Sequence, residues 1–232
     1  MAVEGLRVER INMKPIIFNT EAVRAIQDGR KTVTRRVIKP KYTNTTIISK
    51  SGKVFETVGT PATTAEIKFP YEAGDILYVR ETYCAFNTDH IIDGVKYAYK
   101  ADSTSESESV RKELGYKWLP SIHMPKEAAR IFFKVTDVRV ERLQDITEEQ
   151  ARAEGIGGYW AEPYNNEPPF VAPDVGSDLF YTRKEAFEKL WNSTVKKFDL
   201  ENYGWEANPW VWVIKFERIS KEDTPWKENT TR

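Results

Sequence analysis

The segments with a strand pattern constrain the fold of this chain most, because they outnumber the helix patterns and do not alternate with them regularly. Residues 129–143 (ARIFFKVTDVRVERL) alternate well enough to predict one long strand, or two strands with a bulge at Thr136 and Asp137. Residues 208–219 (NPWVWVIKFERI) are apolar on both faces at first, which is typical of a central strand. Residues 71–83 predict a turn that leads into a further strand. This order predicts an α+β fold with a mostly antiparallel sheet, either open or closed into a small barrel.

Three segments carry the residue types that begin and end helices. Residues 18–31 (FNTEAVRAIQDGRK) offer Asn19 or Thr20 as the N-cap and Gly29 as the stop signal. Two later segments each carry a capping box, in which a threonine is followed three residues later by Gln or Glu. These are Thr147 with Gln150 in residues 145–156, and Thr182 with Glu185 in residues 181–193. The last of them is the clearest helix, with a buried stripe of Phe187, Leu190 and Trp191.

The rest of the chain is predicted to belong to one domain with insertions. The sequence shows no internal repeat and no hinge that would divide it into two domains. Three stretches rich in polar residues, glycine or proline predict loops or insertions. They lie at about residues 41–66, 101–117 and 157–178. Residues 1–12 are expected to be an N-terminal extension, and residues 220–232 a polar, frayed tail.

Composition limits the classes of function. The chain has 232 residues, with 35 basic and 35 acidic side chains, and a net charge of zero argues against a protein that coats nucleic acid through bulk charge. A local basic pocket remains compatible with this balance. Cys84 is the only cysteine, and the two histidines, His90 and His123, are far apart, so we expect no intrachain disulfide, no obligate metal and no cofactor. No apolar run approaches the roughly eighteen residues of a membrane helix and no signal-peptide pattern is present, so we expect a cytoplasmic protein without a membrane partner.

Residues 28–36 (DGRKTVTRR) place four basic side chains around two threonines. The β-branched residues after the glycine predict a strand that ends before Pro40. One interpretation is a solvated edge strand, where lysine and arginine prevent aggregation. The other is a site for an anionic or nucleotide-like ligand, in which the basic side chains donate charge-assisted hydrogen bonds to phosphate or carbonyl groups. The side chains concerned are Arg30, Lys31, Arg35 and Arg36.

Lys31 and Thr34 of this run are candidates for nucleophilic catalysis. Their odd spacing places them on opposite faces of an ideal strand, so they converge only if Lys31 belongs to the turn after Gly29 or if a bulge intervenes. A lysine whose pKa is lowered by burial or by neighbouring cations can accept the hydroxyl proton of a threonine.

Five further residues are candidates outside this run. Glu154 ends a short helix, where the helix dipole disfavours a carboxylate by about 0.3–1 kcal/mol, so it is either functional or a tolerated exposed residue. His123 lies between two prolines in PSIHMP and either makes a structural hydrogen bond or stacks on a base. Arg80 and Glu81, at a strand end, form either a simple ion pair or ligand contacts. Trp212 in NPWVW belongs to the core by default, and the alternative is that its ring stacks on a base.

Five stretches stand out when they are read together: FNTEAVRAIQDGRKTVTRR, the glycine-aspartate turn into ILYVRE, PSIHMP, VERLQDITEEQARAEGI and NPWVWVIKFERI. In this order they resemble the ASCH-domain proteins, and in particular the larger versions common in tailed bacteriophages and prophages. The resemblance covers about residues 13–219 and treats the three polar stretches as insertions. It implies a PUA-like fold, which is a small β-barrel with flanking helices and a cleft beside the barrel.

The resemblance also implies a link to RNA and modified nucleosides. One small bacterial branch of the superfamily hydrolyses N(4)-acetylcytidine with a lysine, a threonine and a glutamate. The lysine and threonine of its G-R-K-T-x-T run correspond to Lys31 and Thr34, and its glutamate corresponds to Glu154. This chain is much longer than the members of that branch, and fold alone does not define function.

These observations leave three functions open. The first is a protein that binds RNA or a modified nucleoside or nucleotide, with the arginines of residues 28–36 on phosphate and a Trp or His ring on the base. The second is an amidohydrolase, in which Thr34 attacks an acyl carbonyl, Lys31 acts as base, and Glu154 moves protons and activates water. The oxyanion is then stabilised by Lys31 or Arg35. The third is a ribonuclease or a protein-interaction module that uses the same cleft. A phage-encoded protein would act in the host cytoplasm.

Overall fold

A computed structural model describes the chain in eight stretches. They are residues 13–41, 46–50, 53–58, 63–86, 95–157, 159–160, 170–171 and 179–225. The expected N-terminal extension lies outside these residues. The chain forms two compact units, and each unit is built from separate stretches of sequence. The first unit contains Met1–Phe18, Ala73–Val135 and Glu217–Arg232, and the second contains Asn19–Glu72 and Thr136–Phe216.

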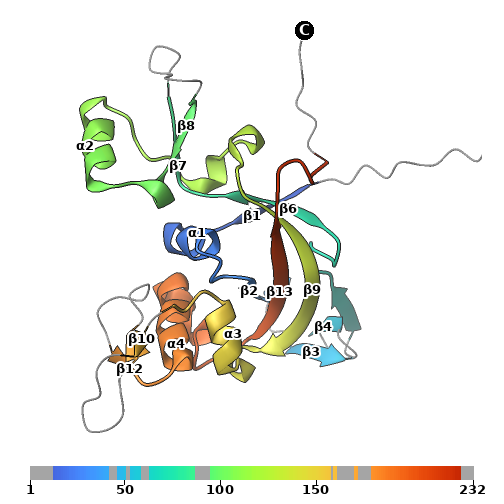
Figure 1. Cartoon of the computed structure of the whole chain (residues 1–232). Coiled ribbons are helices and arrows are strands. Elements are labelled where there is room, and N and C mark those ends of the chain that lie inside the picture. Colours follow the sequence, from blue (N-terminus) through green and yellow to red (C-terminus); the bar gives the residue numbers. More distant parts are fainter. Residues whose placement is uncertain are drawn as a thin grey trace, which may run out of the picture. The chain divides into compact units, whose positions relative to one another are not determined.

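The sheet of the first unit has the strand order β1-β6-β9. β1 (Lys14–Ile17) pairs in parallel with β6 (Ile76–Arg80), and β6 pairs antiparallel with the first residues of β9 (Phe132–Arg142). Gly74 in the turn before β6 has a φ of +95°, a conformation that favours glycine. The predicted turn and strand in residues 71–83 are therefore confirmed, and β9 is the single long strand among the two predicted alternatives (Figure 1).

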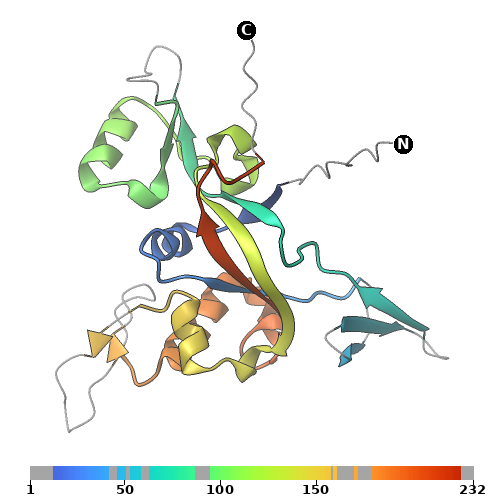
Figure 2. The same cartoon turned by 45° about the vertical axis from the view of Figure 1, so that its right-hand side comes forward.

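The first unit also contains several shorter elements outside this sheet. They are β7 (Tyr83–Ala85), β8 (Tyr97–Tyr99), η2 (Lys100–Asp102), η3 (Ser121–His123) and η4 (Lys126–Ala128). The polar stretch 101–117 also contains α2 (Ser105–Glu113), an α-helix without a single buried residue, which lies beside β7 and β8 (Figures 1 and 2). A capping box of Thr104 and Ser107 begins this helix. The sequence pattern did not predict it, because Ser107 stands where such boxes usually have Glu or Gln.

The core of the first unit joins residues from both ends of the described chain. Met13, Met124 and Phe132 are buried in it, and the partly buried Ile219 packs against them. Phe18 and Phe133 make an edge-to-face contact with ring centroids 6.2 Å apart.

The second unit begins with α1 (Thr20–Gln27). Asn19 is its N-cap, because its side chain accepts a hydrogen bond from the backbone N–H of Ala22 at 2.9 Å. Gly29 follows the helix with a φ of +72°, as expected for a stop signal. The predicted helix and both of its ends are therefore confirmed.

The sheet of the second unit has the strand order β9-β13-β2. β2 (Val33–Val37) pairs antiparallel with β13 (Trp210–Ile219), so that Arg35 lies opposite Val213 and Thr34 opposite Ile214. Opposite residues share a face of the sheet and successive residues alternate between faces. Arg35 therefore lies on the face that packs on α3 and α4, and Thr34 lies on the other face.

Helices and 3-10 turns cover one face of this sheet. They are η5 (Leu143–Asp145), α3 (Glu148–Ala153), α4 (Arg183–Thr194), η7 (Lys197–Asp199) and α5 (Leu200–Tyr203). α3 and α4 lie side by side (Figures 1 and 2), and both predicted capping boxes are present. Phe187 and Trp191 are buried in the core as predicted, whereas Leu190 is only partly buried. Glu148 of α3 also accepts hydrogen bonds from the first two N–H groups of α4, at 2.9 and 3.1 Å.

Residues 41–66, expected to be a loop or hairpin, contribute a three-stranded antiparallel sheet. Its strands are β3 (Thr46–Lys50), β4 (Lys53–Val58) and β5 (Thr63–Ile67), and Figure 2 shows it apart from α3 and α4. The prediction missed the third strand because the apolar residues are too sparse to give a steady period. One of them, Val54, is fully buried and belongs to a cluster with Ile38 and Trp212.

The predicted loop 157–178 lies mostly outside the described residues. Its described parts contribute β10 (Tyr159–Trp160) and β11 (Phe170–Val171), which form a small sheet with β12 (Leu179–Phe180). The described residues form five α-helices and several sheets, which is an α+β fold, as predicted. Each strand order within the described residues has two free edges, so no closed barrel forms there.

Candidate functional site

Lys31 and Glu154 meet in the second unit although 123 positions separate them in sequence. The N–H groups of Arg30 and Lys31 both donate to the carbonyl of Ala25, which keeps Lys31 in the turn that closes α1. Lys31 and Glu154 then form an isolated antiparallel bridge, and the neighbouring Thr32 N–H donates to the carbonyl of Ala153 at 2.8 Å. The turn after α1 is thus attached to the C-terminal end of α3 through the backbone.

Gly155 makes this close approach possible. Its φ is +98°, and a Cβ at this position would lie 2.9 Å from the Cβ of Ala25 and 3.1 Å from that of Lys31. Any other residue would strain the backbone and push the two segments apart.

The side chains of Lys31 and Glu154 form a buried ion pair. The Lys31 ammonium donates to Glu154 Oε2 at 2.6 Å and to the Glu154 backbone carbonyl at 2.7 Å. Only 7% of the Lys31 side chain and 4% of the Glu154 side chain are exposed. The interpretation of Glu154 as a tolerated exposed glutamate is therefore wrong: the cations beside it offset the unfavourable helix dipole.

Arg35 extends this pair into a network. Its guanidinium, fully buried, donates to Glu154 Oε1 at 3.0 Å, to Glu141 Oε2 at 3.1 Å and to Gln150 Oε1 at 2.9 Å. Gln150 is the same residue that completes the capping box of α3, since its Oε1 also accepts from the Thr147 N–H. The interpretation of residues 28–36 as a solvated edge strand does not hold for Lys31 and Arg35, because both are buried and paired with carboxylates.

Burial changes the acid–base chemistry of Lys31 and of Arg36, the residue after Arg35 in β2. Removal from water lowers the pKa of the Lys31 ammonium, and the adjacent Glu154 carboxylate only partly opposes this effect. Burial likewise lowers the pKa of the Arg36 guanidinium, against the smaller opposing effects of Tyr71 and Glu154. Lys31 is therefore a buried ammonium that loses its proton more readily than an exposed lysine.

Thr34 is close to this network in sequence but is not hydrogen bonded to it. Its side chain is buried, with 4% exposed, and it lies on the face of β2 opposite to Arg35. Within the described residues its hydroxyl makes no hydrogen bond to Lys31 or Glu154. The structure thus brings Lys31, Arg35 and Glu154 together, while a nucleophilic role of Thr34 stays a prediction.

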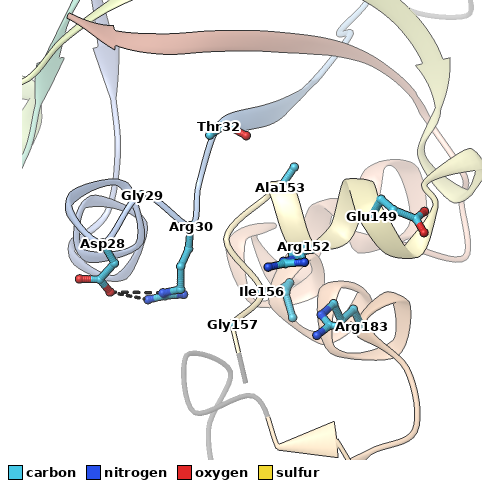
Figure 3. A pocket seen from close by; sticks show the side chains of 10 residues that line it. All are labelled: Asp28, Gly29, Arg30, Thr32, Glu149, Arg152, Ala153, Ile156, Gly157 and Arg183. Carbon is cyan, nitrogen blue, oxygen red and sulfur yellow. Dashed lines mark hydrogen bonds and ion pairs between the residues drawn. The ribbon is translucent and has the colours of Figure 1, made fainter. Parts of the chain in front are cut away.

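A cavity of about 630 Å³ lies beside the bridge. Its walls come from the chain on either side of Lys31 and from α3, the residues after it, and the first residue of α4 (Figure 3). The residues that line it are Asp28, Gly29, Arg30, Thr32, Glu149, Arg152, Ala153, Ile156, Gly157 and Arg183. Lys31 and Glu154 do not line it. Their ion pair holds its walls together.

Arg80, Glu81 and His123 belong to the first unit and have partners there. Arg80 donates to the backbone carbonyls of Met124 and Ile122, so it fastens the PSIHMP segment. His123 is exposed, and its backbone carbonyl accepts a hydrogen bond from the Tyr83 hydroxyl at 3.1 Å. The described contacts of these three residues are with other residues of the first unit and do not indicate a ligand site.

Glu81 forms a buried ion pair, but its partner is Arg130 rather than Arg80. Two parallel hydrogen bonds of 2.9 and 3.0 Å join them, and Arg130 also pairs with Asp102. Trp212 is 9% exposed and stacks on Phe69, with ring centroids 4.8 Å apart. The structure places Trp212 in a core cluster.

Sequence reasoning missed four residues of the second unit that complete this region. They are Glu141, Gln150, Arg152 and Arg183. The capping box marked Gln150 only as a structural residue, and no sequence signal placed Glu141 or Gln150 beside Arg35, because these contacts span 106 and 115 positions. No sequence signal marks Arg152 or Arg183, since single arginines are common on helix surfaces.

Comparisons with models of known protein families, with curated proteins and with solved structures each gave no match. The described part of the chain contains no helix that is long and apolar enough to cross a membrane. It also contains no group of three or more His, Cys, Asp or Glu side chains that could hold a metal ion. What the site can do must therefore be argued from its own geometry.

Proposed function

We propose that this chain is an ASCH-related protein of PUA-like type that binds RNA or a modified nucleoside in the cavity beside the Lys31–Glu154 bridge. One observation carries the proposal: two of the five stretches on which the ASCH resemblance rests, those that contain residues 28–32 and 149–156, form opposite walls of a single cavity. Lys31 and Glu154 hold these segments together, while the alternate residues Arg30 and Thr32 line the space between them.

The size and lining of the cavity suit such a ligand. Pockets for small ligands usually measure roughly 300–1,000 Å³ and combine apolar surface with a few charged groups. Here Ile156 and Ala153 provide apolar surface, and arginine and threonine side chains provide hydrogen-bond donors. A neutral chain with a local basic cavity fits a ligand of one or a few nucleotides better than a long nucleic-acid track.

Blocking the cavity tests the proposal. Isothermal titration calorimetry would measure binding of cytidine, N(4)-acetylcytidine and a short single-stranded RNA to the full chain. Thr32 is exposed and lines the cavity, so Thr32→Phe would place a bulky ring in this space and is expected to abolish binding of the ligand. Thr64→Phe, at an exposed position of β5, is the matched control and should bind normally. Equal binding by both variants would place the ligand elsewhere, and no binding of any ligand to the unaltered chain would reject the proposal.

A second candidate function is the amidohydrolase. Its support is the lowered pKa of Lys31, since a lysine that loses its proton more easily can serve as a general base. In this reaction the Thr34 hydroxyl would transfer its proton to Lys31 and attack the acyl carbonyl. Lys31 would pass this proton through the Glu154 carboxyl group to the amine nitrogen, and the C–N bond would break to leave a threonine ester. Glu154 would then take a proton from water, the resulting hydroxide would cleave the ester, and that proton would return to the Thr34 oxygen as the acid leaves.

The hydrolase is tested by incubation with N(4)-acetylcytidine and detection of cytidine and acetate by mass spectrometry. Thr34→Val keeps the shape of this buried side chain but removes its hydroxyl, and it should abolish turnover. Lys31→Ala should do the same. Turnover that survives in Thr34→Val would exclude the threonine as nucleophile, and no turnover by the unaltered chain would leave binding as the function.

A further inference from the structure

Three guanidinium groups from separate elements line the cavity. Arg30 comes from the turn after α1, Arg152 from α3 and Arg183 from the first position of α4. Figure 3 shows Arg30 on one wall, with its guanidinium turned toward Asp28, and Arg152 and Arg183 on the other wall. Two carboxylates, Asp28 and Glu149, are the only acidic side chains among the described lining residues, so the cavity carries an excess of positive charge.

The Arg30 guanidinium is held in a fixed position at the cavity wall. Its Nη1 donates to the carbonyl of Gly155 at 2.6 Å, and its Nε and Nη2 donate to Asp28 Oδ2 at 3.2 and 3.0 Å. Gly157 packs directly on it, because a Cβ at this glycine would lie 2.7 Å from Arg30 Nη1. A guanidinium that is already oriented loses less conformational entropy when an anion binds.

Glu149, the second acidic side chain of the cavity lining, lies apart from the arginines. In Figure 3 the Glu149 carboxylate is separated from the Arg152 and Arg183 guanidiniums. Its first-turn position in α3, where it accepts hydrogen bonds from its own backbone N–H and from Thr147, lowers its pKa and keeps it charged. Glu149 therefore weakens the positive potential of the cavity from a distance, without a described contact to Arg152.

We propose that Arg30, Arg152 and Arg183 form a phosphate-binding site, so that the ligand of the cavity is phosphorylated. The exposed Thr32 hydroxyl lines the same space and can donate a further hydrogen bond to a phosphate oxygen. This inference rests on the proposed function and narrows it, because a free nucleoside carries no group that uses three guanidiniums. Arginine suits phosphate because its planar fork donates two parallel hydrogen bonds. The phosphate comes either from a mononucleotide or from the backbone of RNA.

Calorimetry with the full chain separates these cases. The probes are cytidine 5′-monophosphate, cytidine, inorganic pyrophosphate and a short single-stranded RNA. Cytidine 5′-monophosphate should bind at least about tenfold more tightly than cytidine, the effect of one charge-assisted hydrogen bond. Arg152→Gln should remove about that factor for the phosphorylated probe and leave cytidine unchanged.

Three further variants sharpen the test. Gly157→Ala displaces the Arg30 guanidinium without changing any charge, and it should lower the affinity for cytidine 5′-monophosphate. Glu149→Gln removes a negative charge from the cavity wall, and it should raise the affinity for cytidine 5′-monophosphate. Lys189→Gln removes an exposed charge from α4 outside the cavity lining and should have no effect.

Each outcome decides between the proposals. Tight binding of the monophosphate and pyrophosphate identifies a nucleotide site, and binding of RNA alone identifies a backbone site. For RNA, Arg152→Gln should also lower the salt dependence by about one released counterion. Equal affinities for cytidine and its monophosphate, insensitive to Arg152→Gln, would overturn the phosphate site while leaving nucleoside binding intact. No binding of any probe would overturn both.

Discussion

Replacing Glu154 with glutamine should be among the most damaging single changes in the second unit. The substitution keeps the size of the side chain and removes the carboxylate that faces Lys31 at 2.6 Å and Arg35 at 3.0 Å. Arg35 keeps Glu141 and Gln150 as partners. Lys31 loses its 2.6 Å contact with the carboxylate and keeps its 2.7 Å contact with the backbone carbonyl of residue 154, so a buried ammonium loses its described carboxylate partner.

The degree of burial sets the expected magnitude. Removing one partner of a buried ion pair costs about 3–5 kcal/mol, because it leaves an uncompensated charge out of water. The corresponding loss for a solvent-exposed pair is about 0–1 kcal/mol. With exposed fractions of 7% and 4%, the Lys31–Glu154 pair belongs to the buried class, so we expect Glu154→Gln to lower the free energy of unfolding by about 3–5 kcal/mol.

A double-mutant cycle measures the pair directly. Urea unfolding of Lys31→Met, Glu154→Gln and the double variant should show that the double variant loses much less stability than the two single losses added together. The exposed pair Lys53–Glu66, with a 3.4 Å separation, is the matched control, and its cycle should give a coupling below about 1 kcal/mol. Equal coupling energies in the two cycles would refute the assignment of a buried, mutually dependent pair.

The pH dependence gives a second readout. Burial already lowers the pKa of folded Lys31 below its usual 10.5, and Glu154→Gln removes the carboxylate that opposes this shift. The unfolded chain then binds a proton that the folded chain releases, so stability rises with pH until the unfolded lysine loses its own proton. Glu154→Gln should therefore recover stability between neutral pH and pH 10.5 more steeply than the unaltered chain. A flat difference between the two curves would contradict this linkage.

Three further predictions follow from other contacts. Gly155→Ala should cost more than about 1 kcal/mol in urea unfolding, because φ is +98° and two side-chain carbons lie within 3.1 Å, whereas Gly29→Ala, with open space around it, should cost less. Burial raises the pKa of Tyr99 to about 12, so an absorbance titration at the phenolate band should show a late step that disappears in Tyr99→Phe. The free energy of unfolding should fall between pH 10 and 12, because the tyrosine of the unfolded chain ionises first. Glu148→Ala removes the carboxylate that caps α4 and should lower the unfolding free energy by about 0.5–2 kcal/mol, while Glu149→Ala, without that contact, should change it less.

Local chemistry made the helices predictable from the sequence. Asn19 and the threonine capping boxes satisfy backbone groups within a few residues, so their signal does not depend on the rest of the fold. The same holds for β9 and β13, whose long alternating or apolar runs are visible without partners. The position of Glu154 against the helix dipole correctly pointed to a special environment, which the nearby cations provide.

Features that depend on distant partners could not be predicted. β1 is only four residues long and pairs in parallel with a strand about sixty positions away, so nothing in its own sequence defines it. The sheet in residues 41–66 depends on a few apolar residues that pack on Trp212 from the far end of the chain. Arg152 and Arg183 line the same cavity only because α3 and α4 lie side by side. The identity of Arg130 as the partner of Glu81 likewise follows from tertiary contacts.

The interleaving of the two units has a consequence for biosynthesis. Met13 packs with Phe132 and Ile219 in one core, and Val33 packs with Val213 in the other. Neither core can close before β13 has left the ribosome, because in each core β13 packs with residues that lie far before it in the sequence. Contacts at such large separations slow folding, so the nascent chain should depend on protection from aggregation until β13 has been synthesised.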